Sequence, residues 1–217
     1  MKPVMQKFTT HRGIAAPLLR NNIDTDAIIP SVEMKKVSKR GLSDGLFAAW
    51  RYIDRVKRVP NTEFVLNQPD YQKASILLSG RNFGCGSSRE HAVWALDEYG
   101  IRAIVAPSFG AIFSANCIAN GLLPARLPED QVQSLASWVA ADPQNNQLTI
   151  DLQTRSITTY EGQAYFFEIL DADAEMLLQG LDPIALTMQM EAAIQKFEQT
   201  SRVARPWVEL TKSVPVT

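Results

Sequence analysis

The sequence predicts an α/β protein with a core of parallel strands and flanking helices. The first observation is the apolar run Ala74–Ser79, which ends at Gly80 and is typical of a buried strand. The second is the run Arg102–Ala106, which follows a segment with helical spacing of its apolar residues. Two strand and helix units in succession indicate neighbouring parallel strands with right-handed crossovers.

A helix is expected between these two strands. Ser87 and Ser88 are residues that commonly cap a helix start, and Gly100 is suited to end the helix. A second helix is expected over residues 107–120, before a strand over 122–127. The apolar stripe of the first helix, at positions i, i+3, i+4 and i+7, consists of Ala92, Ala95, Leu96 and Tyr99.

The rest of the chain is less regular. A strand over 13–19 leads into the turn-forming cluster Asn21–Asp26. Residues 31–70 form a long irregular segment with one short helix over 46–52, and such segments are usually functional or mobile. Later elements are a helix between Pro128 and Asp142, strands over 148–152 and 164–169, and a last helix over 184–198. We expect one domain over residues 1–200, followed by a peripheral or disordered tail over 201–217.

The charge balance argues against a nucleic-acid surface. The 217 residues contain 22 Lys and Arg and 23 Asp and Glu, a net charge of −1, whereas phosphate binding requires clustered basic charge. The one basic cluster is best interpreted as a solvated loop. It consists of Lys35, Lys36, Lys39 and Arg40.

The supply of soft metal ligands is small. The chain has two cysteines and two histidines: Cys85, Cys117, His11 and His91. An iron-sulfur cluster needs about three or four thiolates, and a structural zinc site needs about four Cys or His ligands, usually in paired spacings that are missing here. Any soft-metal chemistry is therefore expected to come from a partner, and this chain is expected to bind no metal.

The compartment is expected to be the cytoplasm. Two cysteines do not make a disulfide framework, which indicates a reducing environment. The first residues lack the apolar core of a signal peptide, and no run approaches the roughly 18 apolar residues of a membrane span.

The segment Gly80–His91 is the motif that carries chemistry. Glycines between a buried strand and a helix start let backbone N–H groups converge, and the helix amino terminus adds to an anion site. The planar fork of Arg89, in the first turn, can bind a carboxylate bidentately. The motif therefore predicts a site for a carboxylate or phosphate.

Two other interpretations of this motif stay open, helix caps and a cysteine nucleophile, and two nucleotide-binding patterns are excluded. The two serines, taken alone, are most simply helix caps. The P-loop pattern lacks its lysine, and the dinucleotide pattern lacks its third glycine. A cysteine nucleophile, Cys85 with the nearby His91, is conceivable but has no evident orienting third group.

At this point the residues resemble a known family. The run Gly84–His91, with Asn22–Asp26 before it and the segments 107–109 and 120–124 after it, resembles the swivelling domain of the aconitase superfamily. For a free chain of this length, the resemblance is to the small subunits of 3-isopropylmalate dehydratase. It covers roughly residues 5–200 in order, and the Gly-Ser-Ser-Arg-Glu-His core is highly specific.

The resemblance implies a β/β/α swivelling domain and a hydro-lyase activity. In this family the small subunit pairs with a large subunit that holds a four-iron cluster. The enzyme interconverts 2-isopropylmalate and 3-isopropylmalate, both small dicarboxylates, through isopropylmaleate in leucine biosynthesis. The long segment 31–70 would include the substrate loop.

The resemblance also implies roles for residues of the motif. Ser87 would be the base, as an alkoxide that takes a proton from the carbon beside a carboxylate. Arg89 would bind a substrate carboxylate, with Ser88, Gly86 and the loop amides around it.

Four further positions are less specific. Asp26 matches an acidic active-site position, with an Asx turn as the alternative. Arg51 is expected to be a second carboxylate contact, with a surface arginine as the alternative. Cys85 is expected to pack the loop, and His91 to orient the helix start.

The choice of substrate stays open in the sequence. A small subunit of a homoaconitase or a citraconate hydratase would share the motif, and a stand-alone anion-binding module is a further alternative. Apolar residues of the long segment can line a pocket for an isopropyl group or simply pack. These are Leu42, Leu46, Phe47 and Trp50.

Overall fold

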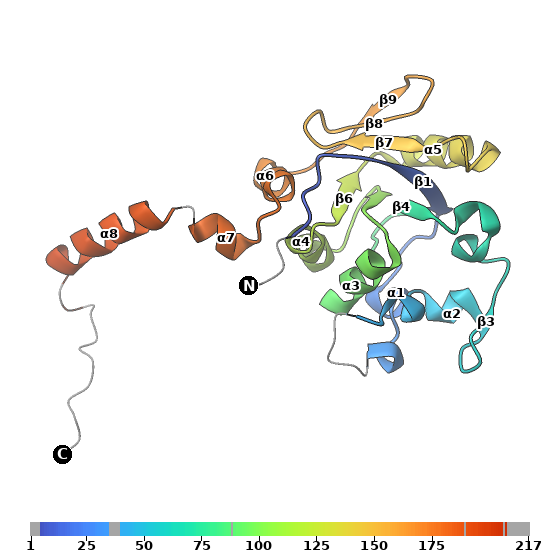
Figure 1. The fold of residues 1–217 in the computed structure, drawn as a ribbon, viewed down its shortest axis with the longest axis horizontal. Coiled ribbons are helices and arrows are strands. Elements are labelled where there is room, and N and C mark those ends of the chain that lie inside the picture. The colour runs from blue at the N-terminus through green and yellow to red at the C-terminus, as the bar shows by residue number, and fades with distance from the viewer. Residues whose placement is uncertain (1–4, 35–39, 88, 189, 206, 208–217) are drawn as a thin grey trace, which may run out of the picture.

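The protein is built around one mixed β-sheet (Figure 1). The structure, a computed structural model, describes residues 5–34, 40–87, 89–188, 190–205 and 207. Within that part of the chain the main sheet has seven strands in the order β6-β5-β4-β1-β7-β8-β9. Their bounds are β1 Thr10–Leu18, β4 Ala74–Ser79, β5 Ala103–Ala106, β6 Leu123–Arg126, β7 Leu148–Asp151, β8 Ser156–Thr158 and β9 Ala164–Phe166.

One half of this sheet is parallel, as the sequence predicts. Strands β6, β5, β4 and β1 run in the same direction, and Leu77 in β4 pairs with Ala16 in β1 and with Ile104 in β5. All four residues of β5 are buried, which explains why this strand appears in the sequence as a continuous apolar run. The predicted α/β fold class is confirmed.

The other half of the sheet is antiparallel. The first residues of β1 pair with β7, and the strand then shifts register between Ile14 and Ala15 before it pairs with β4. The turn that contains Gly162 was expected to join the strands over 148–152 and 164–169. It joins β8 to β9 instead, because the additional strand β8 lies between the two predicted strands. Because β8 has only three residues, its alternation is too short to be recognised in the sequence.

Four longer helices accompany the sheet: α3 Glu90–Tyr99, α4 Ala111–Ala119, α5 Glu129–Ala141 and α6 Asp171–Gln179. Helix α3 ends at Gly100 in the left-handed region, with φ +106°, as expected. The helix predicted from residue 107 begins later, because Ser108 and Gly110 form backbone hydrogen bonds with Phe83. Helix α6 was missed, although two acids in its first turn and Gly180 at its end are start and stop signals.

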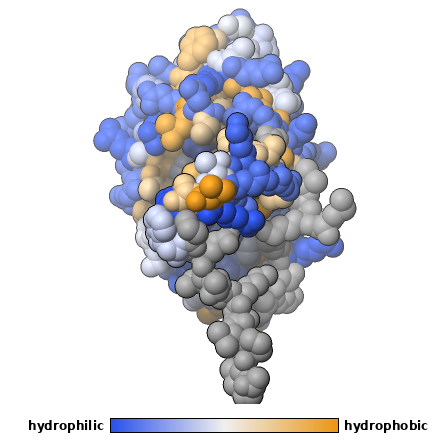
Figure 2. Space-filling view, turned by 90° about the vertical axis from the view of Figure 1, so that its left-hand side faces the viewer, coloured by the Kyte–Doolittle hydropathy of each residue, from blue (hydrophilic) through white to orange (hydrophobic). Residues whose placement is uncertain are grey.

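The predicted last helix is divided in two. Helix α7 spans Pro183–Met188 and α8 spans Glu191–Ala204; we call them together the C-terminal arm. The arm extends from the rest of the molecule in Figure 1, and Figure 2 views the molecule from that side. The boundary predicted at residue 200 falls inside α8. No helix in the described ranges is long and apolar enough to cross a membrane.

The long segment 31–70 is folded into short elements. They are the 3₁₀ turns Ser31–Met34, Ser43–Gly45, Val65–Asn67 and Pro69–Tyr71, the helix α2 Ala48–Arg51, and the hairpin strands β2 Tyr52–Asp54 and β3 Val59–Pro60. Leu42, Leu46 and Phe47 are fully buried in the core, so these three pack. Trp50 is half-buried and stacks on Phe47, with ring centroids 5.7 Å apart.

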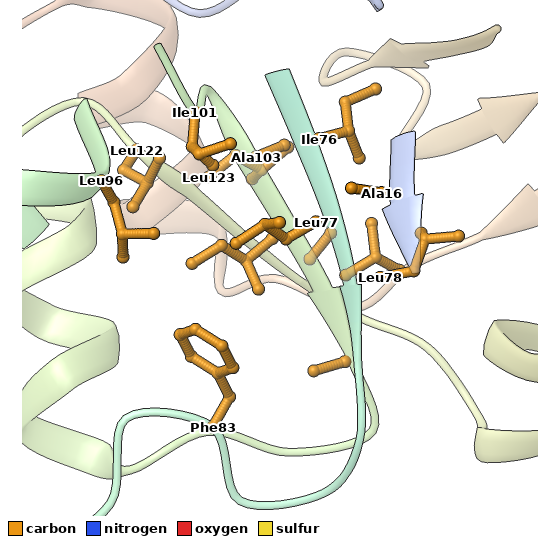
Figure 3. Packing of buried hydrophobic residues seen from close by; sticks show 14 of the residues in the cluster. Ala16, Ile76, Leu77, Leu78, Phe83, Leu96, Ile101, Ala103, Leu122 and Leu123 are labelled. Carbon is orange, nitrogen blue, oxygen red and sulfur yellow. The ribbon is translucent and has the colours of Figure 1, made fainter. Parts of the chain in front are cut away.

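The core lies on both sides of the parallel strands. Figure 3 shows the buried residues of β4 between Ala16 on one side and Leu96 and Leu123 on the other. Phe83, from the loop that follows β4, is also fully buried. The loop with the predicted motif is therefore anchored in the core at its centre.

Candidate active site

The loop Gly80–Ser87, which we call the glycine loop, joins β4 to α3 and is held from two sides. Segment Asn22–Thr25 forms three backbone hydrogen bonds with it, with N···O distances of 2.7–3.1 Å. Segment Ser108–Gly110 forms two more, of 2.8 and 3.0 Å. Three stretches that are far apart in the sequence thus share one backbone network at the end of the parallel strands.

Two glycines of this network have no room for a side chain. A Cβ on Gly84, where φ is +73°, would lie 2.1 Å from Cγ of the buried Phe113. A Cβ on Gly110 would lie 2.4 Å from the carbonyl oxygen of Gly84. The close approach of the glycine loop to α4 therefore requires glycine at both positions.

The aspartates that follow Asn22 have different tasks. Asp24 caps helix α1, Thr25–Ile28, because its carboxylate accepts a 2.6 Å hydrogen bond from the Ala27 N–H. Asp26 instead forms an ion pair with Arg89, with 3.0 Å between Oδ1 and Nη1. The turn role considered for Asp26 therefore belongs to Asp24. Both partners of the ion pair are reachable by solvent, at 56% side-chain exposure for Asp26 and 31% for Arg89.

Ser87 lies beside this ion pair. The Thr25 hydroxyl donates a 2.8 Å hydrogen bond to the Ser87 carbonyl, which links α1 to the end of the glycine loop. Ser87 and Gly86 are both exposed. The N-cap of α3 is Arg89, without a side-chain capping bond, so the expectation that Ser87 caps this helix is wrong. Ser88 lies outside the described residues.

The start of α3 is further fixed by its neighbours. The His91 ring contacts the Trp94 ring, with centroids 4.7 Å apart. Trp94 Nε1 donates to Asn120 Oδ1 at 3.0 Å, and Asn120 Nδ2 donates to Glu90 Oε1 at 3.0 Å. Since Asn120 lies at the end of α4, these contacts tie the two helices together.

Comparison with known proteins gives two family matches. A family model described as Aconitase C-terminal domain matches residues 5–130. A second model, described as the C-terminal domain of the 3-isopropylmalate dehydratase small subunit, matches residues 184–210. A 3-isopropylmalate dehydratase small subunit from Cupriavidus necator is 59% identical over 204 residues, which cover 94% of this chain and 98% of the relative.

This chain belongs to the 3-isopropylmalate dehydratase small-subunit family. A further small subunit, from Roseobacter denitrificans, is 48% identical and covers 94% of this chain and 100% of its own. A solved 3-isopropylmalate dehydratase from Methanocaldococcus jannaschii aligns with a TM-score of 0.62 at 26% identity, over 86% of this chain and 98% of that one. The aconitase-type fold and the hydro-lyase family of leucine biosynthesis are confirmed.

Family membership leaves the individual residues to be judged by geometry. Ser87, Asp26, Arg89 and Gly86, predicted as site residues, lie together around the end of the glycine loop. The name of the family, small subunit, implies a large-subunit partner. It also favours isopropylmalate over the homoaconitase and citraconate hydratase alternatives.

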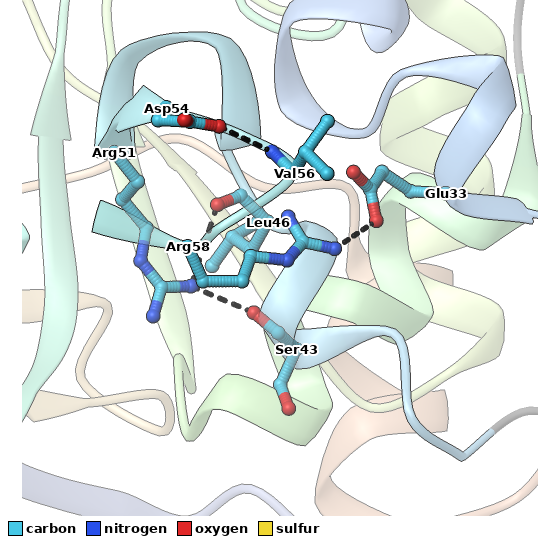
Figure 4. A network of polar contacts seen from close by, with 7 residues as sticks. All are labelled: Glu33, Ser43, Leu46, Arg51, Asp54, Val56 and Arg58. Atoms are coloured by element: carbon cyan, nitrogen blue, oxygen red, sulfur yellow. Dashed lines mark hydrogen bonds and ion pairs between the residues drawn. The ribbon is translucent and has the colours of Figure 1, made fainter. Parts of the chain in front are cut away.

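Arg51 lies in a different setting. Its Nη1 donates to the Ser43 carbonyl at 2.7 Å (Figure 4). Its guanidinium lies against the rings of Tyr52 and Tyr99. Its Nε is buried and has no hydrogen-bond partner among the described residues. Arg51 is therefore neither a free surface arginine nor a member of the group around Arg89.

Glu98, which no sequence motif indicated, binds the same segment as Arg51. The Glu98 carboxylate accepts hydrogen bonds from three successive backbone N–H groups, those of Gly41, Leu42 and Ser43, at 2.5–2.9 Å. Burial raises the pKa of Glu98, but these N–H groups and Arg40 outweigh it, and the net pKa is lowered. The glycine at position 41 was the signal in the sequence, because glycine readily adopts the positive φ seen here, and consecutive N–H groups converge in such a turn.

The potential metal ligands of the chain do not converge. Cys117 is fully buried, and burial raises its pKa well above the ordinary value. His11 hydrogen-bonds to Ser75 at 2.7 Å, while Cys85 is half-buried in the glycine loop. In the described part of the chain, no three Cys, His, Asp or Glu side chains are placed to hold a metal ion. These residues do not fit an iron-sulfur cluster.

An open groove of about 410 Å³ lies near the start of the glycine loop. It is lined by Leu18, Arg20, Trp50 and Phe64, among others. The Arg20 guanidinium lies 4.5 Å from the centre of the Trp50 ring. Trp50 is thus the residue of the predicted apolar set that faces open space.

Proposed function

We propose that this chain supplies the proton-accepting and carboxylate-binding half of an active site that interconverts 2-isopropylmalate and 3-isopropylmalate through isopropylmaleate. The observation that carries the proposal is the exposed group of Ser87, Arg89 and Asp26 on a backbone frame that packs into the core. Ser87 has a side chain that can accept a proton, and Arg89 one that can bind an anion.

Ser87 is assigned as the base. Its alkoxide would take the proton from the carbon beside a substrate carboxylate, and the protonated hydroxyl would return a proton in the reverse direction. A serine alkoxide is strongly disfavoured in water, and Ser87 is exposed in the isolated chain. The proposed chemistry therefore requires a second surface that covers Ser87 and excludes water.

Arg89 is assigned to the substrate carboxylate. The Asp26 contact occupies one of its nitrogens and holds the side chain in place, while the remaining donors of the fork are available to a ligand. Gly86 is exposed with φ +85°, so a carboxylate can approach its peptide without meeting a side chain. Arg51, bound to loop carbonyls, is assigned to positioning residues 43–46.

The surface that covers the site would be the large subunit, and we propose that it carries the four-iron cluster. The dispersed Cys and His residues of this chain support that division. The need to cover Ser87 supports an active site formed between the two chains. A stand-alone anion-binding module would have no such requirement.

The test is reconstitution with the large subunit of the same organism. We expect no turnover from this chain alone and full turnover from the mixture with 2-isopropylmalate, measured by the absorbance of isopropylmaleate. Citramalate and homocitrate serve as competing substrates and should react much more slowly. Activity of the isolated chain, or a preference for homocitrate, would contradict the proposal.

A further inference from the structure

Three large apolar residues lie on one face of helix α8 and its N-cap. Met190, Ile194 and Phe197 follow one another at i, i+4 and i+7. Small residues lie on the same side of the helix, at Ala193, Ser201 and Ala204. Charged and amide side chains occupy the flanks, and Val203 lies on the opposite side. The pattern is that of a helix that buries one face against a partner.

No residue of α8 is buried in this chain. Met190 is 62% exposed, Ile194 38% and Phe197 65%. Fully burying a side chain such as phenylalanine is worth about 1.5–3 kcal/mol, so an amphipathic helix that leaves this face open lacks its partner. Figure 2 shows apolar residues at the surface on the side from which the arm extends.

The open groove of this chain is out of reach of its own arm. The groove is lined by residues of α2 and of the end of β1. In Figure 1, α8 lies at one end of the long axis and α2 near the other end. The partner of the α8 face must therefore be another molecule.

The two family matches indicate which molecule. The aconitase match ends at residue 130, whereas the match over 184–210 covers α8 and is described by the name of the dehydratase small subunit. A domain that works as a separate chain must be held to its partner without a covalent link. Helix α8 lies outside the part of the chain that matches the aconitase domain, and its apolar face is exposed. It is therefore suited to hold the chain to its partner.

We infer that the α8 face formed by Met190, Ile194 and Phe197 docks into an apolar groove on the large subunit. The inference rests on the proposed function, because it takes the large subunit as the occupant. The three anchors lie within seven residue steps of the helix, about 10 Å along its axis, so the groove would accept three successive side chains over that length. Phe197, the largest of the three, is the main anchor.

The experiment compares two variants of the full-length chain, Phe197→Glu and Val203→Glu. Each replaces an apolar side chain by one carboxylate at an exposed position of α8, with Val203 at 86% exposure, so the same charge is placed on opposite faces of the helix. Affinity for the large subunit is measured by titration calorimetry. We expect Phe197→Glu to weaken binding tenfold or more and Val203→Glu to change it less than about twofold.

Turnover at a saturating concentration of both chains separates this inference from the proposed function. The Phe197→Glu variant should then recover normal turnover, because α8 carries no group of the site. If the two variants bound the large subunit with the same affinity, whether weakened or not, the inference would be overturned. The proposed catalytic function would not be affected by that result. Loss of self-association by Phe197→Glu, with unchanged affinity for the large subunit, would identify a second copy of this chain as the occupant and also overturn it.

Discussion

The glycine loop and the C-terminal arm both expose the groups assigned to function, but they are supported differently. The glycine loop is held by five backbone hydrogen bonds to two other segments, and Phe83 anchors it in the core. The arm leaves the body of the protein, and no residue of α8 is buried. The glycine loop presents polar groups on a backbone that is fixed by hydrogen bonds, which we call the frame. The arm presents an apolar face on a helix that does not pack into the core.

The difference corresponds to two kinds of recognition. A small substrate gains from groups whose positions are set before it binds, because little ordering is needed on binding. A protein partner can order a helix as it binds, and the apolar area then supplies the free energy. Substitutions on and around the glycine loop test this contrast.

The change Ser87→Ala removes the assigned base from the fixed frame. Turnover of the reconstituted enzyme should fall by about 10²–10⁴-fold, because the proton of the substrate carbon loses its acceptor. Calorimetric affinity for the large subunit should stay unchanged, since the backbone network does not involve this hydroxyl. The control is Ser134→Ala, an exposed serine on α5 whose hydroxyl donates to the carbonyl of Asp130 on the same helix. Near-normal turnover of Ser87→Ala would contradict the assignment.

The change Gly84→Ala tests whether the frame is rigid. The added methyl would meet Phe113 in a backbone conformation with φ +73°, and we expect a loss of about 2–4 kcal/mol in the free energy of unfolding. Urea denaturation measures it. Gly162→Ala is the matched control, because φ there is +88° but no atom lies within 4 Å, so only about 1 kcal/mol should be lost. Equal losses would show that the frame has room to move.

The change Arg89→Lys keeps the charge and removes the planar fork. The KM for 2-isopropylmalate should rise about 10–100-fold, with a smaller change in kcat, because a bidentate carboxylate contact is lost. Initial-rate kinetics of the reconstituted enzyme measure both constants. Arg12→Lys, at an exposed position near the start of β1, should leave both unchanged. An unaltered KM for Arg89→Lys would exclude Arg89 from carboxylate binding.

The change Glu98→Gln tests a smaller polar contact of the frame. The pKa of Glu98 is lowered in the folded chain, so its charge stabilises the fold above the unfolded pKa, near 4.5, and this stabilisation is lost as pH falls through the folded pKa. We expect the free energy of unfolding of the wild type to exceed that of the variant by about 1 kcal/mol at pH 7. The difference is small because Glu98 is exposed. The gap in the free energy of unfolding should narrow toward pH 3. A gap that does not change with pH would contradict the role of the charge.

Much of the parallel half of the sheet could be predicted from the sequence. Strands β4 and β5 are short buried runs next to glycine or helical spacing, and such patterns depend only on neighbours in the chain. Strand β8 and helix α6 were missed, and one predicted helix proved to be two, α7 and α8. The late start of α4 was also missed, because it depends on hydrogen bonds between Phe83 and residues 108–110.

The chemical groups of the candidate site could be recognised from the order of residues along the chain. The glycines, the serines and Arg89 follow one another directly after a buried strand, so they form a pattern of neighbouring residues. That pattern was enough to predict a carboxylate site, and the small number of Cys and His residues was enough to predict that a partner supplies the metal. Which of these groups contact one another depends on the folded structure. The pairing of Asp26 with Arg89, the binding of three N–H groups by Glu98 and the contact of the Arg51 guanidinium with the Tyr99 ring join residues distant in the chain. Such contacts depend on how the strands and loops pack against one another, and a pattern of neighbouring residues cannot predict that packing.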